Sequence, residues 1–437
     1  MGIKVVKFGG SSVADAIQLQ KTKEIITSDA DRKFVIVSAP GKRFDGDTKI
    51  TDLLYLCKTH IEHNLPYEQL FQVVCDRYRV TEVNLGVTVD LSDEFAAIKA
   101  ELEKGATADY IASRGEYLNA IIIAAYLGYD FVDAAGLVKF NDKGRFMPEE
   151  TNEALKEELA KHERVVMPGF YGSKPDGSIV TFSRGGSDIT GSLVARAVEA
   201  DVYENWTDVS GMLMADPRIV PDAKPITTIS YKELRELSYM GASVLHEDAV
   251  FPVRKANIPI NIRNTNRPED PGTMITAEPA KTDQVITGIA GKKDFTVIAI
   301  YKTGLSDERG FIRRLAGIFE DYDLPIEHLP NGIDTASVVT SSKLIDGHLD
   351  EVLEEIEQQI KPNEIEVIED MCLIATVGSG MAYRPGTAAT LFKALADAGI
   401  NIRMIDQGSS EMNIIVGVDN KHKDAAIEAI YRAFEAE

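Results

Sequence analysis

The sequence predicts an α/β protein in which a parallel-rich sheet lies between helices and is followed by two smaller α+β units. From residue 3 onward, short β-branched strands alternate with helical segments, and strand–helix–strand order produces parallel sheets. After about residue 284 one strand–helix pattern occurs twice, with Leu391 following Leu315 by 76 positions. The chain has 437 residues, which is too long for one ordinary core, so we expect several domains.

The composition narrows the class of function. With 44% hydrophobic and 27% charged residues it is typical of a globular protein, and its formal net charge of -22 argues against nucleic acid or an anionic membrane as partner. No segment offers the roughly 18 uninterrupted apolar residues that span a bilayer, and Lys4 and Lys7 argue against a signal peptide. The 3 cysteines are scattered without metal-binding spacing, so we expect a cytoplasmic protein with reduced thiols and no metal held by the protein itself.

The first element is a strand followed by a glycine turn, in residues 5–12 (VVKFGGSS). Gly9 and Gly10 end the strand and let the backbone approach a ligand closely. The helix that follows presents free N–H groups, which suit a phosphate, and Lys7 lies where its ammonium could reach the same group. An ordinary turn with a surface lysine is the alternative, because a Gly-Gly pair alone is a weak signal.

Two capping boxes are predicted from spacing. Ser12 with Asp15 opens a helix near residue 13, and Ser113 with Glu116 opens an apolar helix over residues 117–127. Glu116 is equally compatible with a substrate contact, and the two roles are not exclusive. Further strands are expected at residues 33–38, 130–132, 164–168, 179–182, 202–206 and 258–263.

A second glycine-rich turn, residues 183–188 (SRGGSD), opens another predicted helix. Arg184 is the residue type that grips a carboxylate with two hydrogen bonds. The alternatives are a surface charge for Arg184 and an ordinary first-turn acid for Asp188. Two such turns, each with a cation, favour a site for an anionic substrate.

The repeat in the second half aligns Gly310 with Gly386, and each copy is predicted as strand, helix, strand, strand, helix, strand. The second copy lacks a last strand, and residues 285–290 provide a spare one that we expect to complete it. This predicts three domains, which cover residues 1–283, 284–368 and 369–437.

Seven short motifs occur along the chain in an order that is specific as a set. They are KFGGSS (7–12), ITDLL (50–54), SRGE (113–116), Gly169–Phe170, RGGSD (184–188), WTDV (206–209) and ADPR (215–218). With this order and spacing the chain resembles the aspartokinases, and its tail resembles the two ferredoxin-like ACT domains of that family.

The resemblance implies an amino-acid kinase that transfers a phosphoryl group from ATP, with Mg²⁺, to the β-carboxylate of L-aspartate. The product is 4-phospho-L-aspartate, at the first step toward lysine, threonine and methionine. A carboxylate is already ionised at neutral pH, so no general base is needed, and the motifs contain no His–Asp or Ser–His pair. Catalysis would consist of positioning and charge stabilisation.

The resemblance also implies roles for individual residues. The residues implied in phosphoryl transfer are Lys7 and Asp188. Those implied around aspartate are Ser38, Thr51, Glu116, Phe170, Arg184, Gly185 and Ser187. Those implied around the nucleotide are Gly9, Gly10, Ser11, Thr207, Asp208, Asp216 and Arg218. Two positions depart from the family: Leu213 stands for a tyrosine that packs on the nucleotide, and Ser243 stands for a lysine near its phosphates.

For the tail, the resemblance implies an inhibitory amino acid, lysine first and threonine second, at the glycine turn before the first ACT helix. The implied residues are Leu305, Asp307, Glu308, Gly310, Phe311, Ile312, Ile326 and Glu327. Their acids would meet the effector ammonium, although a solvated charged turn has the same composition. We expect a homodimer or tetramer through the ACT domains. The alternatives are a non-catalytic amino-acid sensor and a kinase of another carboxylate such as glutamate.

Overall fold

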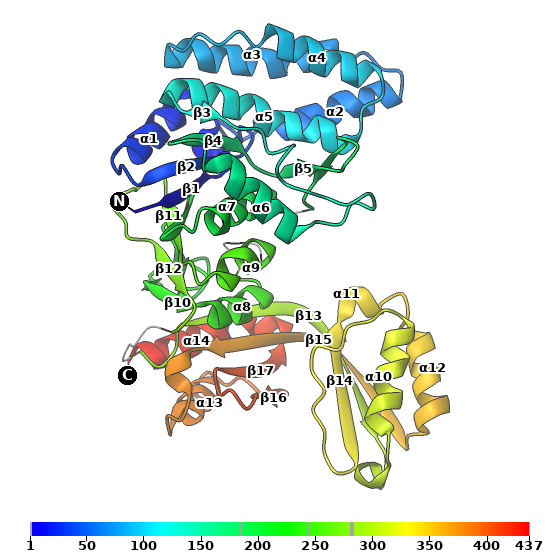
Figure 1. The fold of residues 1–437 in the computed structure, drawn as a ribbon. Helices are drawn as coiled ribbons and strands as arrows, with labels where there is room; N and C mark the ends of the chain where they lie inside the picture. The colour runs from blue at the N-terminus through cyan, green and yellow to red at the C-terminus, as the bar shows by residue number, and fades with distance from the viewer. Residues whose placement is uncertain (1, 184, 243–244, 246, 280–283, 437) are drawn as a thin grey trace. The chain divides into compact units, whose positions relative to one another are not determined.

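The computed structural model describes residues 2–183, 185–242, 245, 247–279 and 284–436 (Figure 1). These residues form two compact units, which we describe separately. The first contains residues 2–212, 225–231 and the described part of 245–279. The second contains residues 213–224, 232–242 and 284–436. Two short stretches, residues 213–224 and 232–242, therefore fold with the tail although parts of the first unit follow them in the sequence.

The first unit is built on one sheet, whose strand order is β10-β12-β11-β7-β1-β2-β4-β3. All neighbouring strands are parallel except β11 and β12, which are antiparallel. The β-branched residues predicted as strands fill its centre, and their carboxyl ends meet at one edge. The strands are β1 (Lys4–Phe8), β2 (Arg32–Val37), β3 (Asp130–Phe131), β4 (Val165–Pro168), β7 (Val202–Thr207), β10 (Thr228–Ser230), β11 (Ile260–Asn264) and β12 (Thr273–Thr276).

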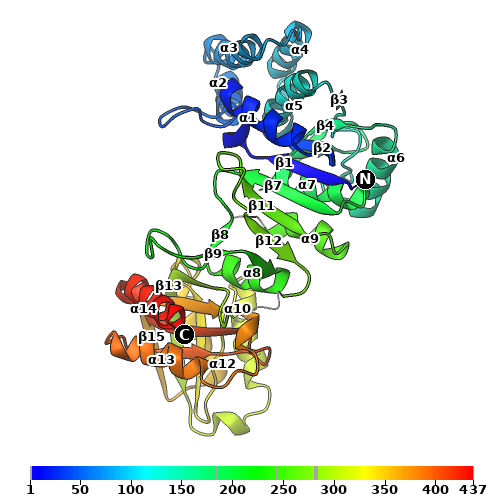
Figure 2. The same ribbon diagram turned by 90° about the vertical axis from the view of Figure 1, so that its left-hand side faces the viewer.

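Helices cover both faces of this sheet (Figures 1 and 2). On one face α1 (Ala16–Thr27) and α5 (Ala108–Leu127) bury apolar side chains against β1, β2 and β4. On the other face α7 (Gly186–Ala197) packs on β1, between α6 (Pro148–Leu159) and α9 (Glu247–Lys255). A short hairpin of β5 (Tyr171–Ser173) and β6 (Ile179–Thr181) lies beside α5.

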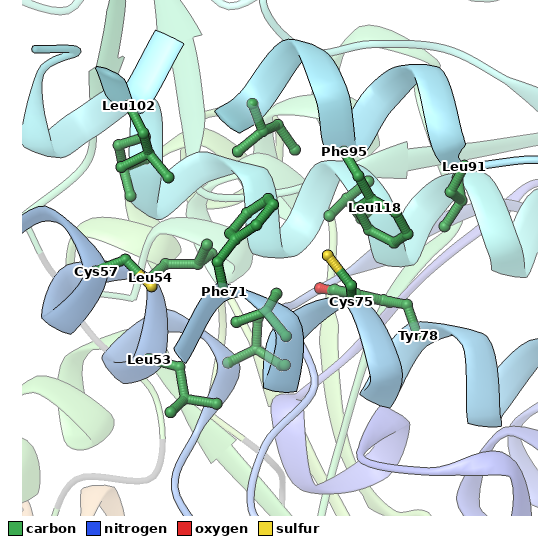
Figure 3. Packing of buried hydrophobic residues seen from close by; sticks show 14 of the residues in the cluster. Leu53, Leu54, Cys57, Phe71, Cys75, Tyr78, Leu91, Phe95, Leu102 and Leu118 are labelled. Atoms are coloured by element: carbon green, nitrogen blue, oxygen red, sulfur yellow. The ribbon is translucent and has the colours of Figure 1, made fainter. Parts of the chain in front are cut away.

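A second layer of helices covers α5 with its own hydrophobic core (Figure 3). The buried residues labelled there lie on α5 and on three covering helices, except Leu91, which directly precedes one of them. Cys57 and Cys75 lie in this core as free thiols, and Cys372 in the second unit is also buried and free. The three covering helices are α2 (Ile50–Glu62), α3 (Glu68–Leu85) and α4 (Ser92–Glu103).

Both predicted capping boxes are wrong. The helix predicted over 117–127 begins at Ala108, where the hydroxyl of Thr107 accepts a hydrogen bond from the Tyr110 amide, so Ser113 and Glu116 lie inside it. Asp15 is itself the N-cap of α1 and accepts from the Gln18 amide at 2.9 Å. Spacing alone could not tell a cap from two polar residues on a buried helix face.

The second unit is built on an antiparallel sheet with the order β14-β13-β15-β17-β16. The spare strand predicted at residues 285–290 is not a separate strand, because residues 288–290 open one long strand, β13 (Gly288–Tyr301), which pairs with the equally long β15 (Glu364–Val377). Residues 288–292 of β13 pair with residues 373–377 of β15, beside β17. The two copies therefore share β13 and β15, with one half of each strand in each copy.

The helices of the two copies correspond along the repeat. In the first copy α10 (Phe311–Asp321) and α12 (Leu349–Ile360) pack side by side, and in the second α13 (Thr387–Asp397) and α14 (Lys423–Glu435) do so (Figure 1). The remaining helices of this unit are α8 (Tyr231–Tyr239) and α11 (Ser342–Ile345). Its remaining strands are β14 (Thr335–Ser341), β16 (Met404–Asp406) and β17 (Asn413–Asp419). Two short strands, β8 (Met212–Leu213) and β9 (Pro225–Ile226), lie where the chain passes between the units.

The predicted fold class is confirmed: a parallel-rich α/β unit is followed by an antiparallel α+β unit. Within the described part of the chain, no helix is long and apolar enough to cross a membrane. In the same residues, no three His, Cys, Asp or Glu side chains come together in a group that could hold a metal ion.

Candidate active site

The site is centred on an ion pair at the carboxyl edge of the large sheet. Lys7 on β1 and Asn205 on β7 are partners in the parallel register. The Lys7 Nζ lies 2.6 Å from Asp188 Oδ1, and the Asn205 amide donates to that same oxygen at 2.9 Å. Both donors are buried. The first turn of α7 thus brings a carboxylate onto two neighbouring strands, 181 positions along the chain from Lys7.

The first glycine turn packs against the loop after β2 without spare room. The Gly9 amide donates to the Trp206 carbonyl at 3.0 Å, and the Gly41 amide donates to the Gly10 carbonyl at 2.9 Å. A Cβ at Gly41 would lie 2.7 Å from the Gly10 carbonyl carbon, and one at Gly9 would lie 3.4 Å from the Lys7 ammonium. Ser11, in contrast, is exposed. The turn therefore offers its outer backbone and the Ser11 hydroxyl beside a lysine, as a phosphate requires.

Glu116 lies where α5 crosses the end of β2. The crossing is close, because a Cβ at Gly115 would lie only 2.8 Å from the Ala39 Cβ. Glu116 is buried, and its Oε2 has no hydrogen-bond partner among the described residues. Burial raises the pKa of this carboxyl to about 8, and the backbone amide of Ala39 acts in the opposite direction. A buried acid with a free oxygen is ready to accept a ligand that carries donor hydrogens.

Phe170 closes the same edge after β4, with a backbone in the left-handed region at φ 82°. A non-glycine residue holds such a conformation only when its surroundings fix it. Here the glycines provide the fit: a Cβ at Gly186 would lie 2.7 Å from the Phe170 ring, and one at Gly169 would lie 2.7 Å from Ser187. Gly185, at φ 58°, is the N-cap of α7. The turn at residues 169–170 and the turn at residues 185–187 are therefore in close contact beside Asp188.

Ser38 and Thr51 stand on either side of the loop after β2. The Ser38 amide donates to the Phe8 carbonyl at 3.2 Å, and its own carbonyl accepts from Asn119 of α5 at 2.8 Å. Thr51 lies in the first turn of α2 and is partly exposed, as is Ser38. Ser38 directly follows β2 and so lies at the carboxyl edge of the sheet that carries Lys7, whereas Thr51 lies on α2, which packs against α5.

The residues predicted around the nucleotide divide between the units. Thr207 ends β7, and its hydroxyl donates to the exposed Asp208 at 3.3 Å. Asp216 and Arg218 belong to the second unit and pair with each other, with Arg218 Nη2 lying 2.5 Å from Asp216 Oδ2. The hydrogen bond from Arg218 lowers the pKa of the Asp216 carboxyl. Asp216 and Arg218 thus form an ion pair with each other.

Two sequence predictions lie outside the described residues, namely the substrate clamp at Arg184 and the departure at Ser243. Sequence reasoning also missed two members of the site, Asn205 and Gly41. A signal existed for Asn205, because an amide in the middle of the apolar strand VYENWT needs a buried partner. Gly41 had none, since its role depends on contact with Gly10.

The glycine turn of the first tail copy forms a cavity of about 240 Å³. Its lining includes five of the predicted residues: Leu305, Glu308, Gly310, Phe311 and Ile312. Glu308 already pairs with Lys302 and Arg314, and the hydrogen bond from Lys302 lowers the pKa of its carboxyl. Asp307 is exposed beside the cavity. Ile326 packs on the hydrophobic core of that copy, and Glu327 accepts a hydrogen bond from the Tyr239 hydroxyl.

A second cavity, of about 390 Å³, occupies the matching place in the second copy. Its lining includes Arg384, Gly386 and Thr387, which follow Glu308, Gly310 and Phe311 by 76 positions. The two cavities therefore lie at matching places in the repeat and place their charges differently, since Glu308 and Arg313 line the first and Arg384 and Glu411 line the second.

Comparisons with known proteins show the family to which the chain belongs. The model of the amino acid kinase family matches residues 2–264, which is more than half of the chain, and a model of the ACT domain matches residues 374–434. The chain thus combines an amino acid kinase domain, whose sheet ends in two glycine turns with Lys7, Glu116 and Asp188 beside them, with a C-terminal ACT domain.

Individual relatives narrow this class. The sequence is 38% identical over 452 residues to Aspartokinase 3 of Bacillus subtilis, with 99% of each chain covered. The crystal structure of Clostridium acetobutylicum aspartate kinase matches with a TM-score of 0.90 at 51% identity, over 99% of this chain and 100% of that one. The chain therefore belongs to the aspartokinase family. Escherichia coli aspartokinase III, in complex with aspartate and ADP, shares the fold at 24% identity and a TM-score of 0.74, over 99% of each chain.

Proposed function

We propose that the chain transfers a phosphoryl group from ATP to the β-carboxylate of L-aspartate at the edge formed by β1, β2, β4 and β7. The observation that carries this proposal is the pair of Lys7 and Asp188, which combines a cation for a phosphoryl group with an acid for an ammonium. Family membership supports aspartate as acceptor, and the product is 4-phospho-L-aspartate, an intermediate toward lysine, threonine and methionine.

Lys7 stabilises the charge of the phosphoryl group in transit. Its ammonium has three donor hydrogens, so it can keep Asp188 and still contact a phosphate oxygen. Asn205 holds the same carboxylate oxygen, which fixes Asp188 before substrate arrives. Since the acceptor carboxylate is ionised at neutral pH, these residues need only position and stabilise charge.

The aspartate substrate lies, in this proposal, between α5 and the two glycine turns. Its α-ammonium is shared by Glu116 and Asp188, and the free Oε2 of Glu116 supports that contact. Arg184 is assigned to the α-carboxylate. The residues assigned to the walls of the pocket are Ser38, Thr51, Phe170, Gly185 and Ser187.

ATP is assigned to the first glycine turn, with Gly9, Gly10 and Ser11 around its phosphates. Thr207, Asp208, Asp216 and Arg218 are assigned to the nucleotide. Mg²⁺ would bind mainly to the phosphates of ATP, where it would supply positive charge while keeping several waters and few protein ligands, and the exposed Asp208 offers one carboxylate at the end of β7. Lys7 then needs to balance only part of the phosphoryl charge.

For regulation we propose an inhibitory amino acid, lysine before threonine, in the cavity lined by Leu305, Glu308, Gly310, Phe311 and Ile312. The acid in the cavity and the family resemblance support this. Asp307, Ile326 and Glu327 are assigned to its surroundings. We also propose the domain limits 1–283, 284–368 and 369–437, with residues 285–290 completing the second ACT domain, and a dimer or tetramer through these domains in the cytoplasm.

The test is ATP- and Mg²⁺-dependent acyl-phosphate formation, trapped with hydroxylamine, with aspartate and glutamate as acceptors. We expect turnover with aspartate, and a fall of at least about a hundredfold in Lys7→Met. Lys4→Met is the matched control, because Lys4 lies on the same strand but pairs with Asp29 at 2.7 Å, away from Asp188.

Each other outcome changes the proposal. Turnover with glutamate in place of aspartate moves the acceptor assignment. Equal losses in both lysine variants remove the role of Lys7. A folded protein that binds an amino acid and phosphorylates neither acceptor is a sensor.

A further inference from the structure

Arg114 is a buried cation that the motifs did not explain. It lies on α5 between Ser113 and Gly115, with 7% of its surface exposed. Its guanidinium carbon is 4.7 Å from the ring centroid of Tyr110, 4.4 Å from that of Tyr117 and 5.3 Å from that of Tyr171. Its Nε and Nη2 both donate to the Ser113 hydroxyl, at 3.1 and 2.9 Å. Three ring faces and one hydroxyl thus hold a charge that is costly to bury.

The ring cage joins the two walls assigned to aspartate. Tyr110, Tyr117 and Glu116 belong to α5, whereas Tyr171 begins β5 and directly follows Phe170. The Tyr171 hydroxyl donates to Asp133 Oδ1 at 2.7 Å, which fixes the ring on which Arg114 packs. Arg114 therefore links the helix that carries Glu116 to the strand that follows Phe170.

Arg114 also brings positive charge toward Glu116. Burial raises the pKa of Glu116 to about 8, while the Ala39 amide and the Arg114 charge both lower it. The titratable groups that face Glu116 from the elements packed on α5 are Tyr55 of α2, Tyr78 of α3 and Tyr171 of β5. Burial raises the pKa of each of these phenols, so all three stay neutral at physiological pH. Among Arg114 and these three tyrosines, Arg114 alone therefore acts on Glu116 with a charge.

We propose that Arg114 is a positioning residue of the aspartate site. It holds α5 against β5, and its charge favours the carboxylate form of Glu116 when the substrate ammonium arrives. This inference rests on the proposed function, in which Glu116 contacts that ammonium. Arg114 itself does not touch substrate, since its guanidinium is enclosed by the three rings.

The test compares Arg114→Gln and Arg114→Lys in the full-length enzyme. Arg114→Gln removes the charge and keeps a donor for Ser113, so we expect the KM for aspartate to rise about tenfold at pH 7.5. The acid limb of kcat/KM for aspartate should move to higher pH by about one unit, because the ionised form of Glu116 loses its support. Arg114→Lys keeps the charge, and its acid limb of kcat/KM for aspartate should stay within about 0.3 pH unit of the wild type. The KM for ATP should change less than about twofold in both variants.

Three results overturn the inference. One is an aspartate KM and pH profile of Arg114→Gln equal to those of the wild type. Another is an acid limb of kcat/KM for aspartate that moves as far in Arg114→Lys as in Arg114→Gln. The third is an equal rise in both substrate KM values with a lowered melting temperature, which is the result of a purely structural arginine.

Infrared titration of Glu116 in the substrate-free protein, identified against Glu116→Gln, separates this inference from the proposed function. The carboxylate band should titrate at higher pH in Arg114→Gln whether or not Glu116 binds aspartate, and an unmoved midpoint overturns the inference. An unchanged aspartate KM in Glu116→Gln instead overturns the proposed role of Glu116.

Discussion

Lys7 and Asn205 face each other across β1 and β7, and both contact the same oxygen of Asp188, at 2.6 and 2.9 Å. Two strands that are neighbours in the sheet therefore hold one acid from the helix after the second glycine turn. Asp188 is held by the charge of Lys7 and by the neutral amide of Asn205. Asn205 therefore keeps the carboxylate in place when Lys7 also contacts a phosphoryl group.

Asn205→Ala should lower kcat for aspartate phosphorylation by about tenfold to a hundredfold, because Asp188 loses its neutral donor and shifts with Lys7. Steady-state kinetics with both substrates varied checks this. Tyr203→Phe is the control, since the Tyr203 hydroxyl donates at 3.1 Å to the backbone carbonyl of Asp188 and not to its carboxylate. A kcat that falls equally in both variants contradicts a special role of the amide.

The raised pKa of Glu116 predicts that kcat/KM for aspartate rises with pH, with a midpoint near 8 in the free enzyme. The carboxyl is neutral below that pH and must lose its proton to bind an ammonium. Aspartate binding at pH 7 should therefore release a proton, which calorimetry in buffers of different ionisation enthalpy measures. In Glu116→Gln the proton release should vanish, and a release that persists contradicts the assignment.

The same group gives a stability prediction of definite sign. Between the ordinary carboxyl pKa of 4.5 and the folded-state pKa of about 8, Glu116 binds a proton in the folded state that the unfolded chain has lost. The free energy of unfolding attributable to Glu116 therefore falls as pH rises through this window. Glu116→Gln should gain stability relative to wild type from pH 5 to 8 in urea unfolding. A stability difference that is flat over this range contradicts the prediction.

Gly41→Ala should raise the KM for ATP by about tenfold, because its methyl group would displace the backbone of Gly10 and Ser11 in the phosphate turn. The KM for aspartate should change less. Gly136→Ala is the matched control, since a Cβ there meets no atom within 4 Å and its backbone is not left-handed. Calorimetric titration with ATP measures the nucleotide affinity of Gly41→Ala and Gly136→Ala. Equal ATP affinity in both variants contradicts the role of the turn.

Glu308→Gln should weaken amino-acid inhibition by about tenfold, because the cavity of the first copy loses its carboxylate and Lys302 and Arg314 lose their partner. Arg384→Gln changes the matching position of the second cavity and should leave inhibition unchanged. Inhibition curves with lysine and with threonine measure both. Loss of inhibition in Arg384→Gln alone places the regulatory site in the second copy.

The sequence by itself determined the parallel α/β unit, the lysine before a glycine turn and the repeat of 76 positions, because these are local patterns of hydrophobicity and backbone freedom. It did not determine that Glu116 lies in the middle of a helix, since its spacing from Ser113 also satisfies a capping box.

Only the tertiary structure decided that Asp188 meets Lys7, that Asn205 joins them and that Gly41 packs on Gly10. It also decided that β13 and β15 each serve both tail copies. These contacts depend on strand order and on the close approach of distant segments. Neither follows from periodicity, because one local pattern is compatible with many orders of strands.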